Sequence, residues 1–287
     1  VGFVAMAIMF YYSVVAGWCY KFLVGAVNGD VLTLGGRGFW DEVQMSSWEP
    51  LFFHLVAMLV AGAIVYRGVI NGIERASKVL IPTLFVLLVA GAIRAVTLPG
   101  AAEGLEFLFR PDFSSLLDYR IWLEGLTQSA WSTGAGWGLL LTYSVYTSRR
   151  DDIVMNSMTI GFGNNSASLL AAILEICSVF ALLPATGGTA AEAREILTEA
   201  GPGNTALSFY WVPALFQQMP GGRVSLVMFF LALVVAAVSS LIAMIELSTR
   251  IFEDAGMERH RAVLFVTVLG FLLGAPSAVS LEFFTNQ

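Results

Sequence analysis

The stretch Gln128 to Gly138, QSAWSTGAGWG, places a glutamine, hydroxyl side chains and three glycines inside an apolar run that covers residues 121–147. Each glycine within a helix costs about 1 kcal/mol relative to alanine. Gly134 and Gly138 are four residues apart, and on their own would be explained by a close helix contact. In a bilayer, unwound backbone is tolerated only where it lines a protein-enclosed cavity, and its freed carbonyl groups can bind a cation. The stretch therefore predicts a broken membrane helix, with its interruption near 132–138, that lines a binding site.

The composition around this stretch is that of a membrane protein. Of the 287 residues, 57% are hydrophobic and 13% are charged, and the net charge is −6. A typical soluble domain has about 25% charged residues. The composition excludes a soluble enzyme, a disordered chain and a nucleic-acid-binding protein, which would need a basic face. The two cysteines, Cys19 and Cys177, lie in apolar runs, which argues against a disulfide framework.

The apolar runs predict seven membrane spans, since a helix needs about 20 residues to cross the hydrocarbon core. Their approximate ranges are 1–27, 46–66, 79–98, 121–147, 153–184, 224–250 and 262–281. The short connections that follow the second, fourth and sixth spans are rich in Arg and Lys, so we place them in the cytoplasm. The long connections then face outward. The longest of them, 185–223, contains two short helical segments joined by Gly201, Pro202 and Gly203, and could form a lid or a surface cap.

The first residues carry no basic leader and are already apolar, so we expect the chain to be an internal piece of a longer protein.

Four segments in this order and spacing resemble the neurotransmitter:sodium symporter family of LeuT-type secondary transporters. They are Gly72 to Phe85 (GIERASKVLIPTLF), Gly104 to Phe113 (GLEFLFRPDF), the broken stretch, and Ala236 to Ala243 (AAVSSLIA). The resemblance implies an all-α polytopic membrane protein with part of a five-helix inverted repeat. It also implies that the seven spans are the third to ninth of about twelve, in a bacterial or archaeal plasma membrane. The lipid bilayer and the remainder of the transporter would be the partners of this chain.

The resemblance also implies a set of substrate-binding residues. Tyr12 lies mid-span, too deep for the interfacial aromatic belt, so its hydroxyl needs a buried partner. In the family this tyrosine binds the substrate carboxylate, whereas the alternative is a core tyrosine bonded to a neighbouring helix. Trp131 takes the place of an aromatic gate above the substrate, although core packing also explains a tryptophan. The other residues that the resemblance places at the pocket are Ile8, Ser132, Gly134, Trp137, Ser240 and Met244.

Two groups of oxygen-bearing residues are candidate sodium ligands. Ala236, Ser239 and Ser240 are spaced i, i+3 and i+4, so a carbonyl and two hydroxyls share one helix face, and hard cations prefer such oxygens. On spacing alone, small residues at a helix contact are the better explanation, and it is the resemblance that selects the sodium site. It assigns Ser132 and Asn164 to a second sodium ion.

Chloride is the other ion that the resemblance implies. In chloride-dependent members, hydroxyl and amide donors bind the anion, whereas chloride-independent members have an acidic side chain there. Gln128, Ser132, Asn164 and Ser168 match the donor set, and Ser168 stands where the acid would be expected.

An inner gate and three acids complete the candidate residues. By resemblance, Tyr146 and Asp254 would hold an arginine from the absent N-terminal segment. Glu124, Glu175 and Glu246 lie within the predicted spans, where acidic side chains are costly and commonly functional. For Glu246 we expect a role in bracing the broken helix by accepting backbone hydrogen bonds.

These observations predict a sodium-coupled symporter of a small neutral amino acid or related amine that works by alternating access and catalyses no chemistry. A proton-coupled carrier of the same fold, with Glu175 as relay, is the alternative within transport. A non-transporting membrane receptor or a membrane enzyme is the alternative outside it. Against an enzyme, His54 and His260 lie near span ends, and no nucleophile with a base is visible.

Overall fold

The computed structural model describes residues 2–46, 48–134, 136–148, 150–183, 189–198, 207–217 and 221–285. Within these ranges the regular structure is entirely helical, as predicted. The α-helices are α1 (Gly2–Asn28), α2 (Asp30–Met45), α3 (Glu49–Tyr66), α4 (Arg75–Val96), α5 (Ala101–Phe109), α6 (Tyr119–Thr133), α7 (Leu139–Ser144), α8 (Ile153–Leu182), α9 (Ala190–Thr198), α10 (Val212–Phe216), α11 (Gly222–Asp254), α12 (Arg259–Val279) and α13 (Leu281–Thr285). Three shorter helical turns are η1 (Val69–Glu74), η2 (Ser115–Leu117) and η5 (Leu207–Trp211).

Six helical segments of the described chain are long and apolar enough to cross a membrane. They are Gly2–Asn28, Glu49–Tyr66, Val69–Val96, Ile153–Leu182, Gly222–Asp254 and Arg259–Val279. The run 121–147 instead forms α6 and α7, of 15 and 6 residues, and neither is long enough to span a bilayer alone. The difference arises because glycines divide this run, whereas the other runs continue as single helices.

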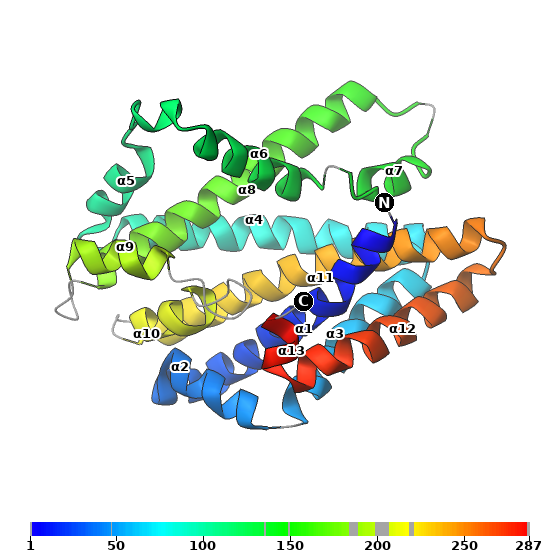
Figure 1. The fold of residues 1–287 in the computed structure, drawn as a ribbon, viewed down its shortest axis with the longest axis horizontal. Helices are drawn as coiled ribbons and strands as arrows, with labels where there is room; N and C mark the ends of the chain where they lie inside the picture. Colours follow the sequence, from blue (N-terminus) through cyan, green and yellow to red (C-terminus); the bar gives the residue numbers. More distant parts are fainter. Residues whose placement is uncertain are drawn as a thin grey trace.

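Small residues set the closest helix contacts. A Cβ atom added at Gly274 of α12 would lie 2.5 Å from the Phe10 carbonyl oxygen of α1, and one at Gly62 of α3 would lie 2.7 Å from the Thr267 hydroxyl of α12. Real Cβ atoms do not approach so closely, so α1, α3 and α12 pack at a distance that only glycine allows. In Figure 1, α11 runs through the middle of this group, and α4 and α8 lie on its other side.

Two of the long connections contain helices. Within 28–50 lies α2, which buries Val31, Phe39, Trp40 and Val43, and within 99–120 lies α5. Both are shorter than a membrane span, so apolar run length does not indicate them.

Part of the predicted lid, 185–223, lies outside the described residues, including the expected joint at Gly201 to Gly203. The described part forms α9, η5 and α10. Phe209 of η5 packs between aromatic side chains of α1, α2 and α11, with ring centroids 4.8 Å from Phe22, 5.5 Å from Trp40 and 6.0 Å from Phe230. In the described chain, this half of the outer connection is therefore anchored to the membrane helices.

The two halves of the broken span lie at the edge of the molecule. Figure 1 shows that α6 crosses α8, and that α7 lies above the C-terminal part of α11. None of the residues of α6 is buried within the described chain.

Candidate functional site

The broken stretch is interrupted where its glycines lie. Helix α6 ends at Thr133, and α7 begins at Leu139. Gly134, Gly136 and Gly138 have φ angles of +66°, +79° and +85°, in the left-handed region that residues with a Cβ rarely adopt. The turns at Gly134 and Gly138 therefore separate two helices, and Ala135 between them lies outside the described residues.

Two tryptophans flank this interruption. The Trp131 and Trp137 rings meet edge to face, with centroids 4.7 Å apart. This geometry is favourable for indoles, because the positive ring edge meets the negative face of the partner. The pair thus joins residues on either side of the turn at Gly134, while Trp131 is still 48% exposed.

Ser132 and Asn164 come together from α6 and α8. The Asn164 amide donates a hydrogen bond to the Ser132 hydroxyl across 2.8 Å, which leaves the amide oxygen of Asn164 available as a ligand. Gln128 and Ser168, the other two residues of the predicted chloride set, are exposed, and within the described chain neither side chain has a hydrogen bond. The structure thus brings two of the four donors into contact.

The predicted helix face of α11 meets α1. The Ser239 hydroxyl donates to the Ala236 carbonyl oxygen across 2.8 Å, so these two oxygens lie side by side. The side chain of Ser240, one residue on, lies beside the Tyr12 hydroxyl of α1. The predicted sodium set therefore touches the predicted carboxylate-binding tyrosine, which gives Tyr12 the buried partner that it requires. Met244 is buried on the same helix, and Ile8 packs against the core one turn before Tyr12.

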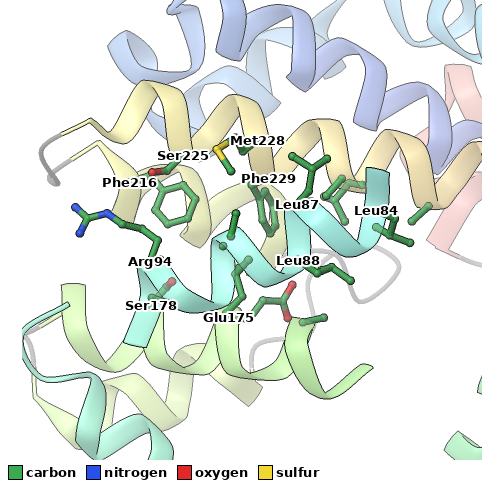
Figure 2. A pocket seen from close by; sticks show the side chains of 18 of the residues that line it. Leu84, Leu87, Leu88, Arg94, Glu175, Ser178, Phe216, Ser225, Met228 and Phe229 are labelled. Carbon is green, nitrogen blue, oxygen red and sulfur yellow. The ribbon is translucent and has the colours of Figure 1, made fainter. Parts of the chain in front are cut away.

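A cavity of about 600 Å³ lies between α4, α8 and α11 (Figure 2). Ser168 and Ala236 line it, whereas the other predicted ligands do not. The cavity is therefore distinct from the site where Tyr12 meets Ser240. It is bordered by Ala236, a predicted sodium ligand of α11, and by Ser168, a predicted chloride ligand of α8.

An ion-pair network lies toward the C-terminal end of α11. Glu246 is completely buried and accepts hydrogen bonds from the Tyr146 hydroxyl at 2.7 Å and from both terminal nitrogens of Arg259 at 3.0 and 2.8 Å. Arg259 also donates to Glu253 at 3.1 Å. A buried carboxylate needs such partners, because its desolvation is costly.

This network corrects our expectation for Glu246. In the described chain the hydrogen-bond partners of Glu246 are the side chains of Tyr146 and Arg259, and not the backbone groups that we expected. Arg259 is a functional candidate that the sequence pattern does not single out, because it is one of several basic residues in a short connection. Asp254, the other predicted gate residue, forms an ion pair with Arg250 of its own helix at 2.9 Å.

Comparison with known proteins places this arrangement in a family. The family described as "Sodium:neurotransmitter symporter family" matches residues 31–280. The chain belongs to the sodium:neurotransmitter symporter family. It is therefore a member of a transporter family, not of an enzyme family, and an integral membrane protein that crosses the bilayer several times.

The sequence is also similar to individual proteins that are named as sodium-dependent transporters. An uncharacterized sodium-dependent transporter of Haemophilus influenzae is 31% identical over 283 residues, which cover 96% of this chain and 58% of that protein. The sodium- and chloride-dependent GABA transporter ine of Drosophila melanogaster is 30% identical over 250 residues, or 82% of this chain and 25% of that protein. The chain thus spans about 58% of the length of the bacterial relative.

A solved structure confirms the fold. The crystal structure of MhsT in complex with L-phenylalanine matches with a TM-score of 0.81 and 31% sequence identity, over 98% of this chain and 61% of that one. The predicted fold class, an all-α membrane protein of the LeuT type, is confirmed.

Proposed function

We propose that this chain is part of a sodium-coupled symporter of a small neutral amino acid or related amine. The observation that carries the proposal is the contact between the predicted sodium ligands of α11 and Tyr12, the residue predicted to bind the substrate carboxylate. Ser240 lies beside the Tyr12 hydroxyl, while its neighbour Ser239 donates a hydrogen bond to the Ala236 carbonyl oxygen. A cation held by these oxygens lies next to the hydroxyl that would bind a substrate carboxylate, so binding of one favours binding of the other.

The test is a sodium titration of substrate binding by the full-length protein. The double variant Ser239→Ala, Ser240→Ala removes two ligands, and we expect the sodium concentration for half-maximal binding to rise at least tenfold, about 1.4 kcal/mol. Ser248→Ala is the matched control. Ser248 lies about two turns after Ser240 on the same helix, and within the described chain its hydroxyl donates only to the Met244 carbonyl oxygen. An unchanged titration in the double variant contradicts the sodium assignment. Sodium-independent uptake driven by a pH gradient would favour the proton-coupled alternative.

Chloride dependence is the second part of the proposal. It is supported by the neutral Ser168 near the Asn164–Ser132 pair, and by the name of the Drosophila relative. A sodium ion among neutral donors lacks a compensating negative charge, which is costly at low dielectric.

We expect uptake by the full-length protein to fall when gluconate replaces chloride, and Ser168→Glu to restore it. Ser157→Glu on the exposed inner turn of α8 should restore nothing. Full wild-type uptake in gluconate excludes the chloride role.

A small substrate cavity is the third part. The Trp131 and Trp137 indoles, which contact each other, would fill much of a substrate cavity at the interruption, so glycine and alanine should compete for uptake better than leucine or tryptophan. Trp131→Phe should enlarge the cavity and narrow that difference. Equal competition by bulky and small amino acids in the wild type contradicts this part.

The inner gate is the fourth part. Tyr146 and Asp254 would bind an arginine from another part of the transporter, with Asp254 exchanging its partner Arg250 for that residue. Asp254→Ala should increase the accessibility of the full-length protein to a thiol reagent added from the cytoplasmic side. Glu258→Ala, which removes only an exposed pair with Arg261, should not.

A further inference from the structure

A histidine of α3 makes a hydrogen bond that the proposed transport site does not use. His54 lies in the second turn of α3 and is completely buried among α1, α3 and α12, all of which belong to the described chain. Its Nε2 atom lies 3.1 Å from the carbonyl oxygen of Phe271 on α12. Because a carbonyl oxygen only accepts hydrogen bonds, Nε2 carries the proton and donates the bond. The two rings also stack, with centroids 5.2 Å apart.

Helix α12 is weakened at the turn where this bond is made. Pro276 has no N–H group, so the carbonyl group of Leu272, four residues before it, lacks its usual helical donor. Gly270 and Gly274 lie on the same stretch, and glycine lowers helix stability. The Phe271 carbonyl is the neighbour of the freed one. The hydrogen bond from His54 therefore ties α12 to α3 where the backbone of α12 is held least by its own helical bonds.

The same turn of α12 seats α1. A Cβ atom added at Gly274 would lie 2.5 Å from the Phe10 carbonyl oxygen of α1 and 2.7 Å from Cε1 of His54. One added at Gly17, about two turns further along α1, would lie 2.7 Å from the backbone nitrogen of His54. The backbone of α1 therefore rests in a notch formed by His54 and Gly274, with no space for a larger side chain.

Tyr12 lies on the seated part of α1, between Phe10 and Gly17. With 3.6 residues per turn, both of these residues are about 140–160° around the helix from Tyr12. The side of α1 that carries Tyr12 faces α11, where the Tyr12 hydroxyl lies beside the side chain of Ser240. The way in which the opposite side rests on α3 and α12 therefore sets where α1 presents the Tyr12 hydroxyl.

We propose that His54 is a positioning residue for substrate binding. Its hydrogen bond to Phe271 holds the notch that seats α1, and the seat of α1 sets the place of the Tyr12 hydroxyl. His54 lies across α1 from Tyr12 and does not itself touch the substrate. The inference rests on the proposed function, because it concerns the proposed role of Tyr12 in binding the substrate carboxylate.

The first test examines the hydrogen bond and needs no substrate. The full-length protein, with ¹⁵N in its histidine rings, is studied by nuclear magnetic resonance in phosphatidylcholine nanodiscs. The signals of His54 are those that the variant His54→Gln lacks. We expect a proton on Nε2 that exchanges slowly with deuterated solvent. A ring with no proton on Nε2 overturns the inference, whether or not the protein transports.

The second test measures binding of radiolabelled L-alanine to the full-length protein. The side-chain amide of glutamine can place a donor where Nε2 lies, whereas asparagine is one methylene shorter and reaches only the place of Nδ1. His54→Asn should raise the concentration for half-maximal binding about tenfold, the size expected for one lost buried hydrogen bond. His54→Gln should raise it less than about twofold. The control His260→Asn, at the exposed start of α12, should leave it unchanged.

A double-variant cycle distinguishes positioning from a general loss of packing. Tyr12→Phe removes the hydroxyl that His54 is proposed to position, so adding His54→Asn to it should weaken binding less than about twofold further. Effects that simply multiply overturn the inference, and so does equal binding by the asparagine and glutamine variants. If the asparagine variant does not fold, a folded His54→Gln that has lost binding overturns the inference alone. A wild-type protein that binds neither glycine nor L-alanine instead contradicts the proposed function.

Discussion

At the scale of single residues, Glu246 and Arg259 depend on each other. Glu246 has no solvent exposure, and Arg259 pairs with both of its oxygens through two nitrogens. Breaking such a pair from one side leaves a buried charge without compensation, which costs about 3–5 kcal/mol, whereas replacing both partners together costs much less. The pair therefore behaves as a unit, and Tyr146 adds a hydrogen bond from the end of the broken span.

We predict that Arg259→Ala destabilises the protein by about 3 kcal/mol. Glu246→Gln combined with Arg259→Ala should recover part of that loss, because the uncompensated charge is gone. The measurement is thermal unfolding of the purified full-length protein for the two single variants and the double variant. Arg261→Ala, whose side chain is 81% exposed, is the control and should change little. Strictly additive effects would show that the two residues act separately.

At the scale of elements, the interruption between α6 and α7 is a property of the backbone. Gly136 has a φ of +79° and open space around the position of a Cβ. Gly125, within α6, has equally open space without a positive φ. The two glycines therefore differ in conformation and not in crowding.

We predict that replacing Gly136 and Gly125 by alanine changes the stability of the protein in opposite directions. Gly136→Ala forces a left-handed conformation on a residue with a Cβ and should destabilise the protein by roughly 1–2 kcal/mol. Gly125→Ala improves helix propensity and should stabilise it by up to about 1 kcal/mol. The measurement is the thermal unfolding midpoint of each variant, compared with that of the wild-type protein. Stabilisation by Gly136→Ala would mean that this segment is helical in the full-length protein.

At the scale of the whole molecule, aromatic packing ties the outer connection to the membrane helices. Phe209 is 1% exposed and contacts rings from three helices, so its loss leaves a cavity in the centre of the cluster. We predict that Phe209→Ala costs about 3 kcal/mol and increases hydrogen exchange across 207–217. Phe113→Ala, at a residue that is 74% exposed, is the control. Unchanged exchange at 207–217 would show that other contacts anchor this segment.

The sequence alone determined the features that depend on local spacing. Apolar run length indicated the six long helices, because bilayer thickness sets the length of a span. Clustered glycines located the interruption, because these turns at Gly134 and Gly138 need positive φ angles. Helical spacing placed Ala236, Ser239 and Ser240 on one face, because that geometry repeats every 3.6 residues.

Only the tertiary structure decided which of these faces meet. The contact of Tyr12 with Ser240, the bond between Tyr146 and Glu246 across 100 residues of sequence, and the place of Arg259 between two acids all join distant segments. The hydrogen bond from His54 to the Phe271 carbonyl oxygen likewise exists only where α3 and α12 pack together. Helical periodicity predicts which residues share a face. Which helix packs against that face depends on the arrangement of all the other helices, and no local sequence pattern encodes that arrangement.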